Sequence, residues 1–367
     1  MKIVICGGHL TPALSLIEVL PKDAEVIYVG RKNAIEGDKG LSLEYQTITE
    51  KNIEFVEIKT GRLQRKFTRH FIPSISKVPY GFASALLLLK KYKPDVVVGF
   101  GGYVSFPIAL AAKSLKIPVV IHEQTLEAGF ANKIIGKFAN KICISFPSSE
   151  RYFPESKTVL TGNPIRKSIL SPVKNFDVPV KEKVIYITGG SQGSHFINSM
   201  VQENIVKMLE DYVVIHQVGD SQKFNDYENL LKIKSELPEE KRKKYFIFKH
   251  LTPDEVGGIL KTADLVIARS GINTVSELIV LKKPSFLIPL PISQKNEQLR
   301  NAKYLKDLGL GEIELQKDLN PERFYEKIKL MMENYSDYKI TNEKDNFPKD
   351  AAEKIKEVVY ASAKSHH

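Results

Sequence analysis

Short apolar runs rich in valine and isoleucine alternate along the chain with longer segments whose apolar residues recur at helical spacing. In the first half these runs predict strands at residues 2–6, 24–29, 54–57, 95–98, 118–121 and 141–144. In the second half they predict strands at residues 184–188, 212–216, 245–248, 265–268 and 285–288. Continuous apolar strands that alternate with helices are typical of parallel sheets covered on both faces. The pattern predicts an α/β protein whose second half repeats the logic of the first.

The two series of strands are separated by Gly162-Asn163-Pro164 and a polar stretch that runs to residue 183. Glycine and proline interrupt regular structure, so the stretch is interpreted as a hinge between domains 1–163 and 164–346. Residues 349–364 carry apolar side chains at helical spacing with lysines between them, which predicts an amphipathic terminal helix.

Charge and cysteine content narrow the function classes. The 367 residues have a formal net charge of +11, which favours a nucleic acid, an acidic membrane surface or a phosphorylated small molecule as partner. Cys6 and Cys143, the only cysteines, lie in predicted buried strands, so a disulfide framework is not expected and a reducing compartment is. The longest apolar run, 80–89, is shorter than the ~20 residues that cross a bilayer, so no transmembrane helix is predicted.

Glycine-rich turns follow several predicted strands. Gly189 to Ser194 (GGSQGS) lies between the strand ending at Thr188 and a helix beginning near His195. Glycines allow close approach of a ligand and a helix amino end attracts anions, so this turn suits a diphosphate. Its spacing fits neither the dinucleotide fingerprint nor the phosphate loop of nucleotide triphosphatases, and a purely structural turn is the alternative.

In the first half, Gly7-Gly8-His9 and residues 99–105 (GFGGYVS) also occupy strand-to-helix junctions, where open α/β folds bind ligands. The alternatives are a structural histidine and close packing of helix on sheet. His122-Glu123-Gln124-Thr125 ends another strand with polar side chains that suit hydroxyl recognition, or form a simple loop.

The second half adds Glu277, on the first turns of a helix, which could accept hydrogen bonds from ribose hydroxyls or simply complement the helix amino end. Gln298 and Asn301 share a helical face and could grip sugar hydroxyls, or be solvated. No zinc-ligand spacing and no Asp-x-Asp pair at a strand end occurs, so an essential metal is not predicted.

A basic and apolar segment suggests contact with a membrane. Cations at 62, 65, 66 and 69 precede Phe71-Ile72 and the apolar run 80–89, which is followed by Lys90, Lys91 and Lys93. Such a segment favours an anionic bilayer surface. A core helix with basic flanks is the alternative.

Six motifs in this order resemble the MurG family of glycosyltransferases, which add N-acetylglucosamine to the lipid-linked muramoyl-pentapeptide precursor of peptidoglycan. They are 99–107 (GFGGYVSFP), 121–124 (IHEQ), 162–166 (GNPIR), 189–194 (GGSQGS), 269–277 (RSGINTVSE) and 298–302 (QLRNA), and the resemblance spans nearly the whole chain.

The resemblance implies a GT-B fold, with two Rossmann-like domains and a cleft between them. Residues 164–346 would bind UDP-N-acetylglucosamine, and residues 1–163 with 347–367 would bind a polyprenyl-pyrophosphate-linked acceptor and the membrane. The reaction would be an inverting, metal-independent transfer to the 4-hydroxyl of the muramoyl sugar, which converts lipid I into lipid II. The enzyme would be cytoplasmic and peripheral on the inner face of the plasma membrane.

The resemblance also implies residue roles. His9, whose ordinary pKa of about 6.5 suits proton exchange, would be the catalytic base. The donor would be held by Arg166, Gly190, Ser191, Gln192, Gly193, Ile272, Asn273, Thr274, Val275, Ser276, Glu277 and Gln298. The acceptor would be held by Gly7, Gly8, Tyr103, Glu123, Gln124 and Thr125.

The sequence departs from the family at two places. The usual first turn, Gly-Gly-Thr-Gly-Gly-His, is shortened to Gly7-Gly8-His9, and the usual His-Glu-Gln-Asn ends in Thr125. Two other functions stay open, namely a UDP-sugar epimerase of similar build and a non-catalytic binder of lipid-linked sugar. Nucleic-acid binding is not expected, because the basic residues are dispersed and no recognition module occurs.

Overall fold

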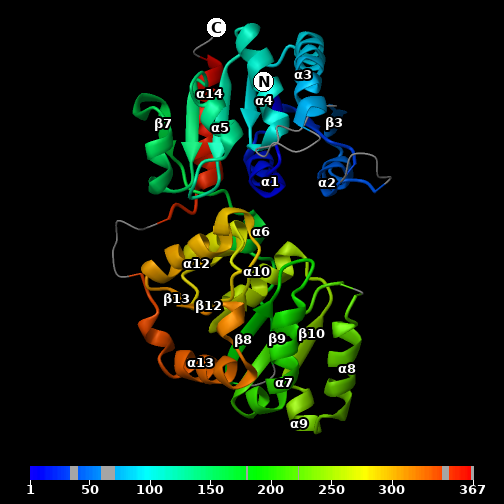
Figure 1. Cartoon of the computed structure of the whole chain (residues 1–367), viewed down its shortest axis with the longest axis vertical. Helices are drawn as coiled ribbons and strands as arrows, with labels where there is room; N and C mark the ends of the chain where they lie inside the picture. Colours follow the sequence, from blue (N-terminus) through cyan, green and yellow to red (C-terminus); the bar gives the residue numbers. More distant parts are fainter. Residues whose placement is uncertain (34–39, 59–70, 179–180, 222, 341–346, 365–367) are drawn as a thin grey trace. The chain divides into compact units, whose positions relative to one another are not determined.

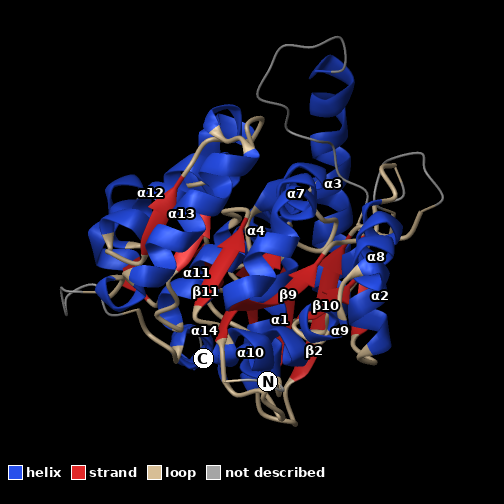
Figure 2. Cartoon of the chain, turned by 90° about the horizontal axis from the view of Figure 1, so that it is seen from below, coloured by secondary structure: helices blue, strands red, loops and turns tan. Residues whose placement is uncertain are grey.

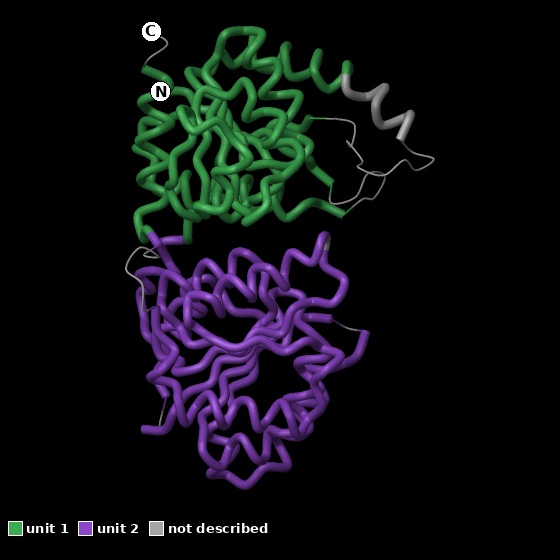
Figure 3. The backbone as a smooth tube through the Cα atoms, turned by 60° about the vertical axis from the view of Figure 1, so that its left-hand side comes forward, with its two compact units in different colours: residues 1–165, 348–367 green, residues 166–347 purple. Residues whose placement is uncertain are grey.

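A computed structural model describes residues 1–33, 40–58, 71–178, 181–221, 223–340 and 347–364, with side chains except at 71–78 and 294. The chain divides into two compact units, unit 1 with residues 1–165 and 348–367, and unit 2 with residues 166–347 (Figure 3). The sequence analysis placed the two crossings slightly earlier, after residues 163 and 346.

Unit 1 is built on a parallel sheet whose described strands run in the order β3-β2-β1-β4-β5-β6-β7 (Figure 1). The strands are β1 (Lys2–Cys6), β2 (Glu25–Gly30), β3 (Glu54–Glu57), β4 (Val96–Gly99), β5 (Val119–Glu123), β6 (Lys141–Ile144) and β7 (Thr158–Leu160). The α-helices are α1 (Leu10–Val19), α2 (Leu43–Glu50), α3 (Phe71–Tyr92), α4 (Gly102–Ser114), α5 (Phe130–Ile135) and α14 (Ala351–Lys364), with 3-10 helices at Pro147–Tyr152 and Glu155–Lys157.

The two faces of this sheet carry different helices. Val4 on β1 belongs to the cluster that packs on α3 and α4, whereas its neighbours Ile3 and Ile5 belong to the cluster of α1 and α14. Successive strand side chains point to opposite faces, which is why a continuous apolar strand can serve both layers. The amphipathic terminal helix is confirmed as α14, whose Ile355 and Val359 are fully buried in unit 1.

Unit 2 repeats this plan with parallel strands in the order β10-β9-β8-β11-β12-β13. The strands are β8 (Lys183–Thr188), β9 (Tyr212–Gln217), β10 (Tyr245–Phe248), β11 (Leu265–Ala268), β12 (Ser285–Leu287) and β13 (Gly311–Ile313). The α-helices are α6 (Lys167–Leu170), α7 (His195–Asp211), α8 (Asp226–Glu236), α9 (Glu239–Arg242), α10 (Pro253–Thr262), α11 (Ile272–Val280), α12 (Glu297–Asp307) and α13 (Pro321–Glu333), with 3-10 helices at Gln294–Asn296, Gln316–Asp318 and Tyr335–Asp337. Figure 2 colours the strands of both units red and their helices blue.

The eleven strands predicted from the apolar runs are confirmed, and none of their ends is shifted by more than two residues. β7 and β13 were not predicted, because each has only three residues and no sustained apolar run. Within the polar stretch interpreted as a hinge, residues 167–176 pack on α10: Ile169 is fully buried, and the carbonyl of Phe176 accepts a 3.0 Å hydrogen bond from Thr262. Within the described ranges, no helix is both long and apolar enough to cross a bilayer.

In each sheet the strand order reverses beside the first strand: successive strands are added on one side of β1 or β8 and then on the other. The reversal lies between β1 and β4 in unit 1 and between β8 and β11 in unit 2. Ligands of open parallel sheets bind outside the carboxyl ends of the strands at this reversal. The glycine turns singled out in the sequence follow these strands, so the fold brings each pair of turns to one sheet edge.

Candidate active site

A cavity of about 200 Å³ lies at the carboxyl edge of the second sheet, and we refer to it as the β8–β11 cavity. It brings together five of the residues predicted to bind the donor, from three separate stretches of chain. Its wall is formed by Arg166, Tyr186, Thr188, Gly190, Ser191, Gln217, Leu251, Pro253, Val256, Leu260, Val266, Thr274, Glu277 and Leu278.

Arg166 and Glu277 form an ion pair on the wall of this cavity, with 3.3 Å between Nη2 and Oε1. Burial raises the pKa of the Glu277 carboxyl, and the neighbouring Arg166 guanidinium opposes that rise. The Nε of Arg166 is buried and makes no hydrogen bond. The guanidinium is therefore held in place by a carboxylate while it keeps a donor for a further anion.

The helix α11 begins beside this pair without a side-chain cap. Its first residue follows Gly271, around which a Cβ atom would meet nothing within 4 Å. The first N–H groups of a helix have no partner within the helix, and they carry a partial positive charge. The open start of α11 is therefore suited to a phosphate group.

The start of α7 is different, because a side-chain cap and neighbouring residues of unit 2 already form hydrogen bonds there. Ser194 caps the helix by accepting from the Ile197 N–H at 3.4 Å. The same hydroxyl accepts from Arg269, at 3.1 Å from Nε and 2.7 Å from Nη2. Within the turn, the Gly190 N–H donates to Thr188 and the Gly193 N–H to the Gly190 carbonyl. These hydrogen bonds hold the turn in place, and Ser191 at its tip lines the cavity.

Gln217 is a cavity residue that the sequence analysis missed. Its Oε1 accepts hydrogen bonds from the hydroxyl of Tyr186 at 2.8 Å and from that of Thr188 at 3.3 Å. The signal was present, because an amide follows the apolar run of β9 at the same sheet edge as the glycine turns. The sequence analysis also missed the apolar wall of the cavity, which consists of Leu251 and residues of α10. In the sequence, this segment has only the features of an ordinary helix start.

Seven residues predicted for the donor do not line the cavity. The side chain of Val275 is fully buried, and the Oε1 of Gln298 accepts the Leu290 N–H at 3.0 Å. Their roles stay predictions, and the residues concerned are Gln192, Gly193, Ile272, Asn273, Val275, Ser276 and Gln298.

The two glycines of the turn after β8 should respond differently to substitution. Both have positive φ, +87° at Gly190 and +76° at Gly193, which costs alanine about 1–2 kcal/mol. A Cβ at Gly193 would also lie 2.0 Å from the Val218 carbonyl oxygen, whereas one at Gly190 would meet nothing. We expect Gly193→Ala to lower the melting temperature clearly more than Gly190→Ala, measured by circular dichroism. Equal decreases in melting temperature for the two variants would contradict the close approach of Gly193 to the Val218 carbonyl.

In unit 1, the turns after β1 and β4 pack directly on each other. A Cβ at Gly7 would lie 2.7 Å from the Phe100 backbone, so only glycine fits there. The Gly8 N–H donates to the Gly101 carbonyl at 3.1 Å. The His9 ring lies against Gly101, where a Cβ would be 3.2 Å from its Cδ2. These glycines therefore allow the two turns to pack closely, and the packing also fixes His9; acceptor binding by Gly7 and Gly8 stays a prediction.

His9 is the residue before α1, and its environment keeps the ring neutral. Burial lowers the pKa of His9 from its ordinary 6.5, and the Glu123 carboxylate partly opposes this. A neutral imidazole is the form that can accept a proton. His122 is also neutral, with its pKa lowered to about 3 by full burial, but its Nε2 faces the Gly162 carbonyl at 3.3 Å and Ser145 at 3.0 Å.

Glu123 organises the loop after β5. One oxygen accepts from the backbone N–H and hydroxyl of Thr125, at 3.0 and 2.7 Å. The other accepts from the Gly129 N–H at 2.8 Å and from Nδ2 of Asn132 at 2.9 Å. Asn132, which the sequence analysis missed, also lies next to Gly101 and so bridges this loop to the His9 turn.

The remaining residues predicted for the acceptor lie at the same edge. Gln124 is buried, and Tyr103 on α4 is half-buried beneath the guanidinium of Arg31. Acceptor binding by these side chains stays a prediction. The residues predicted to contact a membrane include Arg62, Arg65, Lys66 and Arg69, which lie outside the described residues, as do the side chains of Phe71 and Ile72.

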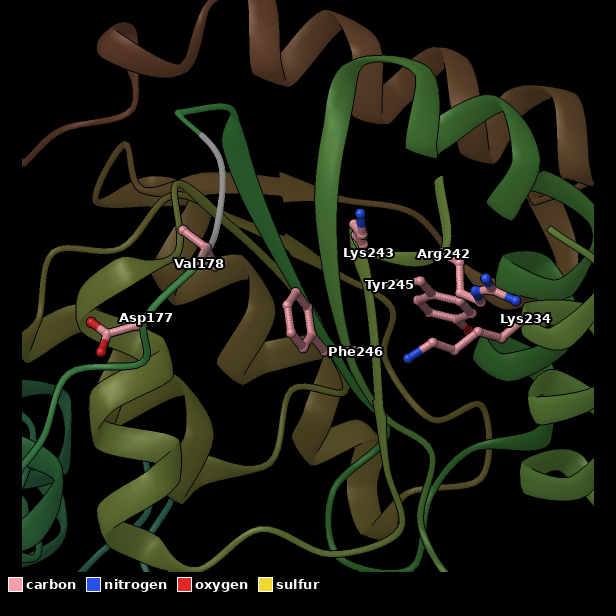
Figure 4. A pocket seen from close by; sticks show the side chains of 7 residues that line it. All are labelled: Asp177, Val178, Lys234, Arg242, Lys243, Tyr245 and Phe246. Carbon is pink, nitrogen blue, oxygen red and sulfur yellow. The ribbon is translucent and has the colours of Figure 1, made fainter. Parts of the chain in front are cut away.

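A second cavity in unit 2, of about 500 Å³, is separate from these turns (Figure 4). It lies at the start of β10, the opposite sheet edge from the glycine turns, and its lining is Asp177, Val178, Lys234, Arg242, Lys243, Tyr245 and Phe246. Across the described residues, no group of three or more histidine, cysteine, aspartate or glutamate side chains is arranged to hold a metal ion. Metal independence stays a prediction.

Comparison with known proteins identifies the family. The glycosyltransferase family 28 N-terminal domain matches residues 6–144, and the family 28 C-terminal domain matches residues 184–357. The chain belongs to glycosyltransferase family 28. This family 28 enzyme is 33% identical, over 98% of its length and 97% of the relative, to a UDP-N-acetylglucosamine--N-acetylmuramyl-(pentapeptide) pyrophosphoryl-undecaprenol N-acetylglucosamine transferase of Acetivibrio thermocellus.

Solved structures agree with this family 28 assignment. The crystal structure of Acinetobacter baumannii MurG matches with a TM-score of 0.74 and 25% identity, over 98% of this chain and 99% of that one. A putative UDP-N-acetylglucosamine 2-epimerase from Listeria monocytogenes matches with a TM-score of 0.68 over 99% and 97% of the two chains, but at 14% identity, which shows a shared fold. The GT-B fold of two Rossmann-like domains is confirmed, and the chain is a glycosyltransferase.

Proposed function

We propose that this enzyme transfers N-acetylglucosamine from UDP-N-acetylglucosamine to the 4-hydroxyl of the muramoyl sugar of undecaprenyl-pyrophosphoryl-MurNAc-pentapeptide, converting lipid I into lipid II. The observation that carries the proposal is the 33% identity, over nearly the full length of both chains, to a transferase named for these substrates. The geometry of the β8–β11 cavity gives independent support for a uridine diphosphate ligand.

The donor would bind with its charged and apolar parts on different walls of the cavity. The diphosphate would lie at the start of α11, which has no side-chain cap. There the guanidinium of Arg166, which is paired with Glu277, would donate hydrogen bonds to two phosphate oxygens. The uracil would lie against the apolar wall of Leu251 and Val256, and the ribose hydroxyls would donate to Glu277. This pose places the diphosphate at α11, whereas the turn at α7 contributes Ser191.

The chemistry would be a single displacement at the anomeric carbon. The acceptor hydroxyl attacks as His9 takes its proton, and the bond to UDP breaks with the electron pair leaving on the diphosphate. Fixed N–H groups and Arg166 would stabilise that charge without a metal. One displacement without a covalent sugar-enzyme intermediate inverts the configuration.

The test is a transfer assay with radiolabelled UDP-N-acetylglucosamine and a short-chain lipid I analogue. We expect label to appear in the lipid product in a β linkage, at an unchanged rate in excess EDTA. A new sugar isomer formed from UDP-N-acetylglucosamine alone would indicate an epimerase, and tight UDP-sugar binding without transfer would indicate a non-catalytic binder. Loss of activity in EDTA would overturn the metal-free mechanism.

Peripheral docking on an anionic cytoplasmic membrane face is a further part of the proposal. On α3, Leu87 is 71% exposed and Tyr80 62% exposed, and the last turn carries Lys90 and Lys91. Apolar side chains beside cations favour insertion into an anionic bilayer surface.

We expect Leu87→Ser to weaken binding to anionic vesicles about 10- to 100-fold, since burial of a leucine contributes roughly 1.5–3 kcal/mol. The measurement is vesicle flotation at low and high salt. Leu43→Ser is the matched control, because Leu43 is 70% exposed on α2. Equal effects of both substitutions would remove α3 as the docking helix.

A further inference from the structure

A cation is fixed over an aromatic ring at the carboxyl edge of the first sheet. The guanidinium carbon of Arg31 lies 5.2 Å from the centre of the Tyr103 ring. Arg31 directly follows β2, the neighbour of β1, and Tyr103 lies in the first turn of α4. This contact places a positive charge beside the two packed glycine turns, the first of which carries His9.

The backbone of Arg31 is anchored on both sides. Its N–H donates to Oε1 of Glu44 at 2.8 Å, and its carbonyl accepts from the Ser42 hydroxyl at 2.5 Å. The hydroxyl of Tyr28, at the centre of β2, donates to the Gly7 carbonyl at 3.3 Å. The start of the Arg31 side chain is therefore tied to the same framework as the first glycine turn.

The first glycine turn offers an anion little of its own backbone. The Gly8 N–H is already donated to the Gly101 carbonyl, and Gly7 packs on the Phe100 backbone. The nearby start of α1 has no side-chain cap and no acidic residue in its first turn. Proline at position 12 has no N–H, so only two of the first three helical residues can donate. A diphosphate at this edge would need a further positive group.

The acceptor of the proposed reaction carries such a diphosphate on the sugar that also bears the attacking hydroxyl. If His9 takes the proton of that hydroxyl, the diphosphate lies one sugar ring away, at the same sheet edge. Resting on the proposed function, we infer that Arg31, held over Tyr103, binds the diphosphate of the lipid-linked acceptor. A planar guanidinium suits this role because it grips two phosphate oxygens at once.

Two other cations of unit 1 also lie on aromatic rings. Lys32, next in the chain, lies 5.3 Å from the Tyr45 ring, and Lys133 lies 3.9 Å from the Tyr152 ring. Neither ring belongs to a glycine turn. Lys32 is therefore a matched control, since it differs from Arg31 by one residue and carries the same charge.

The test compares two acceptors in the full-length enzyme. One is the muramoyl-pentapeptide linked through diphosphate to a short prenyl chain, and the other is the same sugar-peptide as a neutral alkyl glycoside. Arg31→Met keeps an apolar stem over Tyr103 and removes the charge. We expect it to raise KM for the diphosphate acceptor about 10- to 100-fold, as loss of charged hydrogen bonds does.

The same variant should leave KM for the neutral glycoside and the affinity for UDP unchanged, and Arg31→Lys should restore part of the loss. Lys32→Met should change neither KM. An equal rise for both acceptors, or no rise for either, would overturn the inference.

A binding measurement separates this inference from the proposed function. Calorimetric titration of geranyl diphosphate into enzyme saturated with UDP needs no turnover. Weaker binding to Arg31→Met than to the wild type supports the inference even if no sugar is transferred. Equal affinities overturn it even if the transferase reaction is established.

Discussion

Replacing His9 with alanine lowers kcat for sugar transfer about 100- to 10,000-fold, the usual contribution of a general base, and leaves the affinity for UDP unchanged. The reason is that His9 lies in unit 1, on a turn fixed against Gly101, whereas the proposed UDP site consists of residues of unit 2. Steady-state kinetics with saturating donor and calorimetric titration of UDP make the two measurements.

The pH dependence of the rate provides a second readout for His9. Because burial lowers its pKa, the ring is neutral at pH 7 and becomes charged only below the ordinary 6.5. A base must be neutral to act, so kcat/KM should be level near neutrality and fall as the pH drops through the lowered pKa. His9→Ala should lack this acidic limb.

His122 supplies the control for that experiment. Its ring is fully buried and contacts the Gly162 carbonyl and Ser145, so His122→Asn should lower the melting temperature and keep the acidic limb. If the limb disappears in His122→Asn and survives in His9→Ala, the base has been assigned to the wrong histidine.

Replacing Arg166 with methionine weakens UDP binding about 100-fold, because charged hydrogen bonds contribute roughly 1.5–3 kcal/mol. The affinity for uridine, which has no phosphate, should stay close to the wild-type value. Substitution of the paired carboxylate gives the opposite test: Glu277→Gln should weaken both UDP and uridine, because the carboxylate is proposed to accept from the ribose. Calorimetry with the two ligands distinguishes these patterns.

A loss of uridine affinity in Arg166→Met, equal to that for UDP, would place the guanidinium at the nucleoside instead. The double variant checks the ion pair seen at 3.3 Å. If the pair orients Arg166, the effects of the two substitutions on UDP binding should not add.

The sheets could be predicted because their strands are buried on both faces. β1 and β8 are continuous apolar runs, and glycine turns mark the ends of both. The same logic fails at β7, whose three residues are too short to form a pattern. It also fails to separate the two helix starts of unit 2, since only the structure shows that Ser194 caps α7 while α11 is left open.

Polar residues at strand ends were located correctly, but their partners could not be. From the sequence, Glu123 is a carboxylate at a sheet edge that could bind a ligand. In the structure its carboxylate accepts four hydrogen bonds from nearby residues of the same segment. Arg269 lies in a motif shared with the family, and it braces Ser194 from a distance of 75 residues along the chain. Such contacts depend on which side chains the fold brings together, and spacing in sequence does not encode them.

The helix α14 completes the core of unit 1 with residues that follow all of unit 2 in the chain. Ile355, Val359 and Ala363 belong to the buried apolar cluster that α14 shares with α1 and the first sheet. During translation, the amino-terminal half therefore emerges from the ribosome with one apolar face uncovered, and it stays so while the second half is synthesised. The second half can close its own core first, so this enzyme is expected to mature in the reverse of its order of synthesis.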